Sequence, residues 1–205
     1  MAYWATYRHA DSRSERTMTD PAGDILVIGI GNLLWADEGF GVRCVEAFDA
    51  AYVAPPGMRV IDGGTQGLYL LPYVTAARKM VIFDAIDFGL PPGTLRVLEN
   101  GDVPAFMGAK KMSLHQTGFQ DVLAAARLVG RFPEELVLIG CQPVELDDYG
   151  GSLRDEVKAQ IEPALRLAHD WLRARAIVLA RRDATSARAL NPAGLAIDAY
   201  ESGLA

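Results

Sequence analysis

The stretch ILVIGIGNLLWADEGFG, residues 25–41, decides the fold of this chain. It opens with a continuous apolar run, Ile25–Ile30, that ends at a glycine, which is typical of a β-strand buried on both faces. Apolar residues at helical spacing follow between Phe40 and Phe48. A buried strand, a glycine turn and an amphipathic helix in succession predict an α/β fold.

The rest of the chain repeats this alternation of apolar strands and amphipathic helices. Further strands are predicted at 58–61, 80–85, 94–98 and 136–139, and further helices at 66–77, at 114–130 and from 152 onward. We therefore expect a single three-layer α/β domain, in which a twisted, mostly parallel sheet of about five strands carries helices on both faces. The strand at 94–98 follows a proline-rich turn and is expected at a sheet edge.

The domain is predicted to span residues 24–180. Half of the 205 residues are hydrophobic, which suffices for one core but not for two. Residues 1–23 are polar and lack periodicity, so we expect a flexible N-terminal tail. We expect residues 181–205 to form a second, C-terminal tail.

Composition excludes several classes of function. A net charge of −6 argues against a nucleic-acid partner, which would require a basic face. Apolar runs all fall short of the ~20 residues that span a bilayer, so no membrane association is expected. The two cysteines, Cys44 and Cys141, form no zinc-type spacing and fit a reducing compartment. A cytoplasmic monomer is the resulting expectation.

Acidic residues crowd the predicted carboxyl ends of the strands. Right-handed crossovers bring these ends to one rim, where such folds bind their ligands. The rim is predicted to carry Asn32, Asp37, Glu38, Asp62, Gly63, Gly64, Asp84, Asp87, His115, Cys141, Gln142, Glu145, Asp147 and Asp148. These carboxylates would repel a phosphate, and the Gly29-x-Gly31 pattern lacks the third glycine of a dinucleotide site. The rim therefore favours a cation.

An imidazole on this rim narrows the choice of cation. Carboxylates alone suit Mg²⁺ or Ca²⁺, whereas an added histidine shifts the preference toward Zn²⁺, Ni²⁺ or Fe²⁺. His115 would be the second residue of a helix that opens with a Ser113–Gln116 capping box, and the helix dipole keeps its ring neutral. Taken singly, Asp37 and Glu38 could cap a helix, Asp84 could bind loop amides and His115 could be a solvated side chain. Their combination indicates a metal site.

Five sequence motifs of this chain resemble those of a known protein family. The segments GIGNLLWADEGFGVR, DGGTQG, FDAID, KKMSLHQ and QPVELDDYGGSL, in this order, resemble the maturation endopeptidases of [NiFe] hydrogenases, especially the branch that serves membrane-bound uptake hydrogenases. The similarity covers roughly residues 24–175. Family members remove a C-terminal extension from the precursor of the hydrogenase large subunit after nickel has been inserted. The partner implied is that precursor, and the cofactor implied is nickel supplied by the substrate.

The resemblance also implies roles for individual residues. The metal-contacting and catalytic positions of the family fall on Glu38, Asp84 and His115. Asp62 belongs to a family motif and is expected to be a supporting or loop-shaping residue, next to Gly63 and Gly64, whose backbone can turn beside the site. Asp148 is expected to contact the substrate. The metal could polarise the scissile carbonyl or bind the attacking water, or Glu38 or Asp84 could act as general base.

Three alternatives stay open. The same rim could serve a nickel-dependent binding or chaperone protein that recognises a metallated partner without cutting it. Cys141 could pair with His115 in a cysteine hydrolase, although a small buried hydrophobe is the favoured interpretation of Cys141. Trp35 could be a partner-facing aromatic residue or a half-buried loop anchor.

Overall fold

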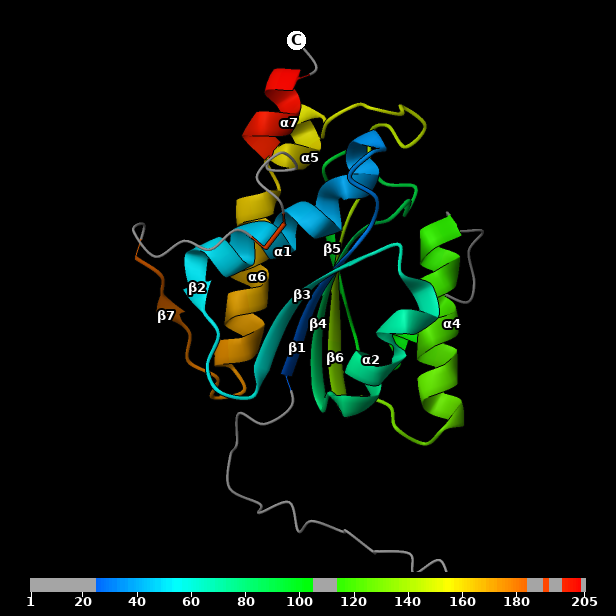
Figure 1. Ribbon diagram of the computed structural model, residues 1–205, viewed down its shortest axis with the longest axis vertical. Helices are drawn as coiled ribbons and strands as arrows, with labels where there is room; N and C mark the ends of the chain where they lie inside the picture. The colour runs from blue at the N-terminus through cyan, green and yellow to red at the C-terminus, as the bar shows by residue number, and fades with distance from the viewer. Residues whose placement is uncertain (1–24, 105–113, 184–189, 192–196, 204–205) are drawn as a thin grey trace, which may run out of the picture.

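A five-stranded sheet forms the centre of the molecule (Figure 1). The computed structural model describes residues 25–104, 114–183, 190–191 and 197–203. The strands are β1 (Ile25–Ile30), β3 (Met58–Gly64), β4 (Lys79–Ala85), β5 (Leu95–Glu99) and β6 (Glu135–Cys141). Their order is β3-β1-β4-β6-β5, with β5 antiparallel to β6 and the other pairs parallel. The predicted sheet and the edge position of the 94–98 strand are confirmed.

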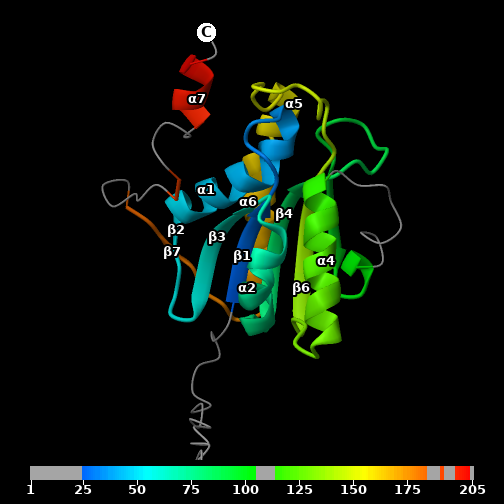
Figure 2. The same cartoon turned by 45° about the vertical axis from the view of Figure 1, so that its right-hand side comes forward.

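Helices cover both faces of this sheet (Figures 1 and 2). On one face lie α1 (Phe40–Ala51) and α6 (Ile161–Arg173), and on the other α2 (Leu71–Ala76) and α4 (Leu114–Leu128). Each face of the sheet packs against its helices in a hydrophobic core, and alternate side chains of β4 belong to the two cores. Val81 and Phe83 pack on the α1 side, and Met80 and Ile82 pack on the α4 side. The three-layer prediction is confirmed, and strand alternation identifies the face of any side chain near the rim.

Two of the predicted helices are divided at prolines. The predicted helix at 66–77 consists of a 3₁₀ turn, η2 (Gly67–Leu70), followed by α2, with Pro72 in the first turn of α2. The predicted helix after residue 152 consists of α5 (Asp155–Lys158) and α6, with Pro163 in the first turn of α6. A proline is tolerated there because its missing N–H would have had no helical acceptor. Among the helices of the described ranges, none is long and apolar enough to cross a lipid bilayer.

The start of α1 lies directly against the sheet. A side-chain carbon at Gly41 would overlap the backbone oxygens of Ile30 and Phe83, and one at Gly29 would overlap the oxygen of Gly41. Glycine at both positions lets the helix backbone approach β1 and β4 at their carboxyl ends. This close packing fixes the short 3₁₀ helix η1 (Ala36–Gly39), which precedes α1, above the end of β1.

The described part of residues 181–205 contacts the domain instead of forming a free tail. Strand β7 (Ala180–Arg181) pairs with β2 (Tyr52–Val53), and helix α7 (Ile197–Gly203) follows. In α7, Glu201 accepts hydrogen bonds from Lys158 at 2.8 Å and from Ser152 at 2.8 Å. These contacts join residues more than 40 positions apart, so local sequence gives no sign of them. Residues 1–23 lie outside the described ranges.

Candidate functional site

Asp84 is a fully buried carboxylate near the carboxyl end of a central strand. It is the penultimate residue of β4 and pairs in register with Gly140 of β6. By alternation its side chain shares the face of Met80 and Ile82, which α2 and α4 cover. Aspartate is rarely buried completely unless it binds another group, so this position indicates a specific structural or functional role.

Glu38 is carried over the end of β1 by a tightly folded loop. The amide of Asn32 donates to the backbone oxygen of Glu38 at 3.2 Å, and the amide of Gly31 donates to that of Gly64 at 3.2 Å. Gly31 has φ +143°, and a side-chain carbon there would overlap the backbone oxygen of Glu38. Only glycine fits this position, which keeps the half-buried Glu38 at the rim.

His115 is the second residue of α4. The amino end of this helix lies at the same end of the molecule as the carboxyl ends of the parallel strands (Figures 1 and 2). Helix α4 covers the sheet face to which Asp84 belongs. The side chain of His115 and Ser113 of the expected capping box lie outside the described residues. The elements that carry Glu38, Asp84 and His115 thus share one end of the sheet.

Acids alone do not complete a metal site at this rim. Among the described residues, which leave out the His115 side chain, no three acidic, cysteine or histidine side chains are grouped so that they could hold an ion. A metal site that includes Glu38 and Asp84 is therefore a proposal, which requires a ligand beyond the described side chains.

Asp62 lies on the opposite face of the sheet from Asp84. In β3 it alternates with Met58 and Val60, whose side chains pack on the α1 side. Its Oδ2 accepts a hydrogen bond from Asn191 Nδ2 at 2.9 Å, and the same nitrogen donates to Glu46 of α1 at 2.8 Å. In the structure Asp62 therefore anchors the C-terminal segment.

The two glycines after Asp62 shape the backbone beside the Glu38 loop. Gly64 has φ +44° and its oxygen accepts the Gly31 amide, whereas a side-chain carbon at Gly63 would crowd Ile28 and Ile30. Both positions therefore favour glycine for local reasons, one for its backbone angle and one for space.

Asp37 organises the rim in a way that sequence reasoning missed. It is fully buried, and its carboxylate accepts backbone N–H bonds from Val144 (2.8 Å), Glu145 (2.9 Å) and Arg154 (2.7 Å). Its own amide donates to the oxygen of Glu145 at 3.1 Å. The sequence suggested only a helix cap, but the acceptor instead ties η1 to the loop at residues 142–154.

The same loop carries Asp148 and an exposed tyrosine. Asp148 forms an ion pair with Arg154 at 2.6 Å, which closes the turn between them. Trp35 and Tyr149 pair through an isolated β-bridge, and their rings meet edge to face with centroids 5.3 Å apart. Gly150 donates its amide to the oxygen of Leu34 at 2.7 Å. Figures 1 and 2 show the loop and η1 side by side at this end of the sheet.

Cys141 is unsuited to be a nucleophile. Its side chain is fully buried in the core on the α1 side, away from the face that α4 covers. Burial, together with the charge of Asp37, raises the pKa of the thiol to about 12. The reactive thiolate is therefore almost absent at neutral pH. The interpretation of Cys141 as a buried hydrophobe is confirmed, and the cysteine hydrolase alternative loses its nucleophile.

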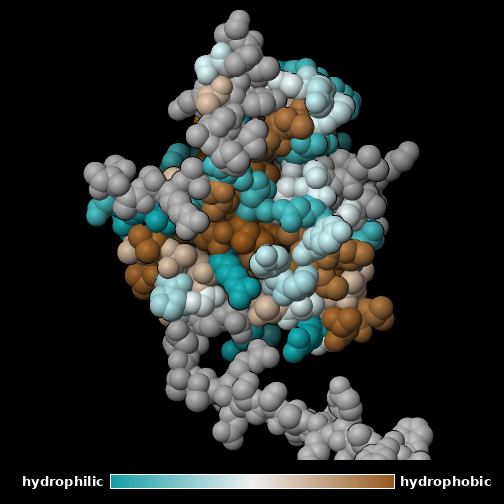
Figure 3. Space-filling view, in the orientation of Figure 1, coloured by the Kyte–Doolittle hydropathy of each residue, from teal (hydrophilic) through white to brown (hydrophobic). Residues whose placement is uncertain are grey.

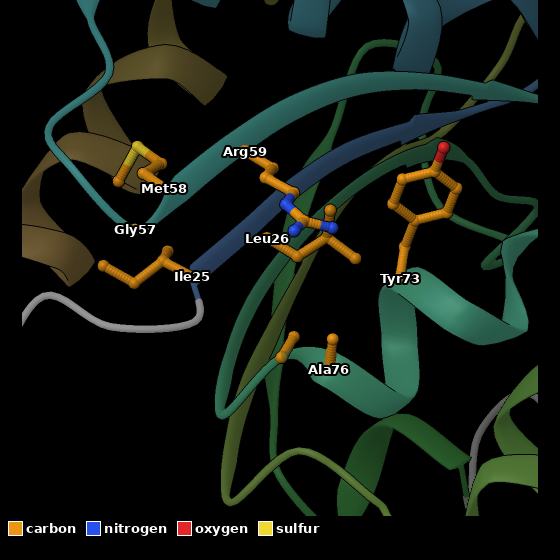
Figure 4. Close-up of a pocket in the computed structure, with 8 residues that line it drawn as sticks. Ile25, Leu26, Gly57, Met58, Arg59, Tyr73 and Ala76 are labelled. Atoms are coloured by element: carbon orange, nitrogen blue, oxygen red, sulfur yellow. The ribbon is translucent and has the colours of Figure 1, made fainter. Parts of the chain in front are cut away.

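A separate pocket lies at the other end of the sheet (Figure 4). Its volume is about 240 Å³, and its walls are the first residues of β1 and β3 together with α2. Ile25, Met58, Arg59 and Tyr73 belong to its lining, which includes no carboxylate. The pocket is thus distinct from the acidic rim.

Comparisons with known proteins agree with one another. Residues 42–171 match the family model described as hydrogenase maturation protease. The chain is 59% identical to "Hydrogenase expression/formation protein HoxM" of Azotobacter vinelandii, over 91% of this chain and 88% of the relative. It is 41% identical to "Hydrogenase 2 maturation protease" of Escherichia coli, over 78% and 97%. The solved structure of the E. coli hydrogenase maturating endopeptidase HybD has a TM-score of 0.73 at 40% identity, covering 78% of this chain and 98% of that one.

Proposed function

Because the chain belongs to the hydrogenase maturation protease family and is an endopeptidase, we propose that it removes the C-terminal extension from the precursor of a [NiFe] hydrogenase large subunit after nickel insertion. A membrane-bound uptake hydrogenase is the proposed source of that precursor. The observation that carries the proposal is the family match over residues 42–171. The acidic rim supports it, because Glu38 and the buried Asp84 lie at the end of the sheet where such folds bind ligands.

In this proposal the nickel of the substrate is the recognition element, and Glu38, Asp84 and His115 are its ligands on the protease. Two carboxylates and one imidazole suit a borderline divalent ion. The positive end of the α4 dipole disfavours imidazolium, so His115 keeps a neutral nitrogen for coordination. A precursor without nickel offers these side chains no ion to bind, which makes metal insertion a condition for cleavage.

Hydrolysis requires water to attack the scissile carbonyl and a proton to reach the leaving amine. The substrate's metal would supply Lewis-acid polarisation of that carbonyl or of the attacking water. Glu38, half-buried at the rim, or Asp84 would accept the proton of the attacking water and pass it on to the amine. Gly31 and Gly41 allow the backbone of Glu38 and the start of α1 to lie close to the strand ends.

The test is cleavage of a purified, nickel-loaded precursor, with the released peptide identified by mass spectrometry. We expect release from the nickel-loaded precursor and none from the nickel-free one. His115→Ala should abolish release, whereas the matched variant His169→Ala on α6, next to Tyr52, should cleave normally. Normal cleavage by His115→Ala would refute the ligand assignment. Stable binding without any released peptide would instead favour the nickel-dependent chaperone.

A further inference from the structure

Apolar side chains are exposed at the rim directly beside Glu38. Leu34 is 41% exposed, Val144 45% and Tyr149 68%, and Trp35, next to Leu34 in the chain, is partly buried against Tyr149. We call these four residues the aromatic ledge. We propose that the aromatic ledge is the docking surface for the precursor segment next to the scissile bond. This inference rests on the proposed function and names the residues that select the substrate's polypeptide.

The aromatic ledge continues into the proposed catalytic site. The amide of Glu38 donates to the oxygen of Trp35 at 2.8 Å, so one turn of the backbone at the start of η1 joins Trp35 of the ledge to Glu38. A polypeptide that places its scissile bond at Glu38 must therefore pass over the surfaces adjoining this turn. Trp and Tyr are the residue types that contribute most to binding energy at protein interfaces.

The structure holds the aromatic ledge rigidly although its side chains are exposed. The fully buried Asp37 fixes the loop at residues 142–154 through three backbone amides, and the Trp35–Tyr149 bridge joins the loop to η1. The amide of Ala36 adds a bond to Gly151 at 3.1 Å. A surface that is already ordered loses little conformational entropy when a partner binds. Such fixation of exposed aromatic residues is expected for docking.

Charge around the aromatic ledge defines the partner's chemistry. Between Val144 and Arg154 the chain carries three acids, Glu145, Asp147 and Asp148, against one base, Arg154. Arg154 already pairs with Asp148, and Asp147 is exposed. The complementary segment presents an apolar side chain to Trp35 and Tyr149, and lysine or arginine to the flanking acids.

Tyr149→Ser tests this inference, because Tyr149 is exposed and its truncation spares the core. We expect the KM for cleavage of the nickel-loaded precursor to rise about tenfold and kcat to change less than twofold. The control is Leu128→Ser: Leu128 is 88% exposed at the end of α4 remote from the rim. Apolar side chains are also exposed in scattered patches on the face of the molecule that Figure 3 shows. The Leu128→Ser variant should keep both constants. Asp147→Lys should also raise KM, by a factor that shrinks with added salt.

Direct binding separates this inference from the proposed function. The dissociation constant of the nickel-loaded precursor is measured for the wild type, Tyr149→Ser and Leu128→Ser by surface plasmon resonance. Unchanged KM and affinity in Tyr149→Ser overturn the docking role even when cleavage is normal. If the wild type binds but does not cleave, the proposed function fails, and a tenfold weaker affinity of Tyr149→Ser still supports docking. Circular dichroism verifies that each variant is folded.

Discussion

Replacing Asp37 by alanine should loosen the rim at a cost that the structure defines. The substitution removes the acceptor of three backbone N–H groups, those of Val144, Glu145 and Arg154. Each amide that loses its partner costs about 1–3 kcal/mol, with the lower end fitting these partly buried groups. Relief of the desolvation of a buried carboxylate offsets part of the sum. We expect Asp37→Ala to lower the free energy of unfolding by about 2–4 kcal/mol.

Asparagine at the same position should cost less. Oδ2 accepts two of the three bonds, and Asp37→Asn can keep an oxygen there while its amide nitrogen faces the N–H of Arg154. We expect a loss of about 1–2 kcal/mol for Asn, smaller than for Ala. The exposed Asp147 in the same loop is the control, and Asp147→Ala should change stability by less than about 0.5 kcal/mol.

Urea denaturation followed by circular dichroism measures these differences, and the slope m verifies that the transitions are comparable. Fluorescence of Trp35, which contacts the loop, should in addition report loosening before global unfolding. A loss below about 0.5 kcal/mol in Asp37→Ala, equal to that of the Asp147 control, would show that the carboxylate does not hold the rim together.

Three further predictions concern other parts of the fold. Gly31→Ala should destabilise by about 3 kcal/mol or more in thermal or urea unfolding, because of φ +143° and the overlap with the η1 loop, whereas Gly101→Ala, with open space around it, should be nearly neutral. Native Cys141, with its thiol pKa of about 12, should resist iodoacetamide at pH 8 for hours, and mass spectrometry that finds rapid alkylation would contradict its burial. Hydrogen bonding to Lys79 lowers the pKa of Glu135 in the folded protein. The ionised Glu135 therefore stabilises the fold at pH values above its pKa in the unfolded chain, which is about 4.3, and this stabilisation is lost as the pH falls through its pKa in the folded protein. Glu135→Gln should therefore be less stable than the wild type at pH 7 and equal to it near pH 2, and a constant difference across this range would be inconsistent with the linkage.

The sheet was predictable because its strands are continuous apolar runs. Each residue of β1 is buried, and such a run has few places to lie other than the middle of a parallel sheet. The strand that follows the proline-rich turn, β5, lies at the edge of the sheet as predicted. The existence of the helices followed from periodicity. The predicted 66–77 helix is divided into η2 and α2, and Pro72 lies in the first turn of α2.

The placement of the elements that carry the candidate residues was predictable, whereas the contacts that support those elements were not. Strand topology brings the elements of Glu38, Asp84 and His115 to one rim, as the sequence suggested. Alternation from Met58 assigns Asp62 to the face opposite Asp84, although its family motif suggested a supporting role beside the site.

Long-range partners had no local signal. The carboxylate of Asp37 accepts hydrogen bonds from backbone amides that lie 107 to 117 positions later in the chain. The hydrogen bonds of the Asn191 side chain to β3 and α1 also join residues more than 100 positions apart. The residues around Glu201 show no apolar periodicity that would predict the contacts of α7 with Ser152 and Lys158. Such contacts become visible only when the chain is folded.

The placement of α7 has a practical consequence for handling the protein. Helix α7 lies next to α5 at the rim end of the molecule, whereas β1 begins at the opposite end (Figure 1). A purification tag or a sensor-chip tether attached after α7 would lie close to the surface at which we propose that the large precursor binds. Immobilisation through the segment that precedes Ile25 leaves that approach open, and a fluorophore attached after α7 would serve as a reporter of the partner's arrival.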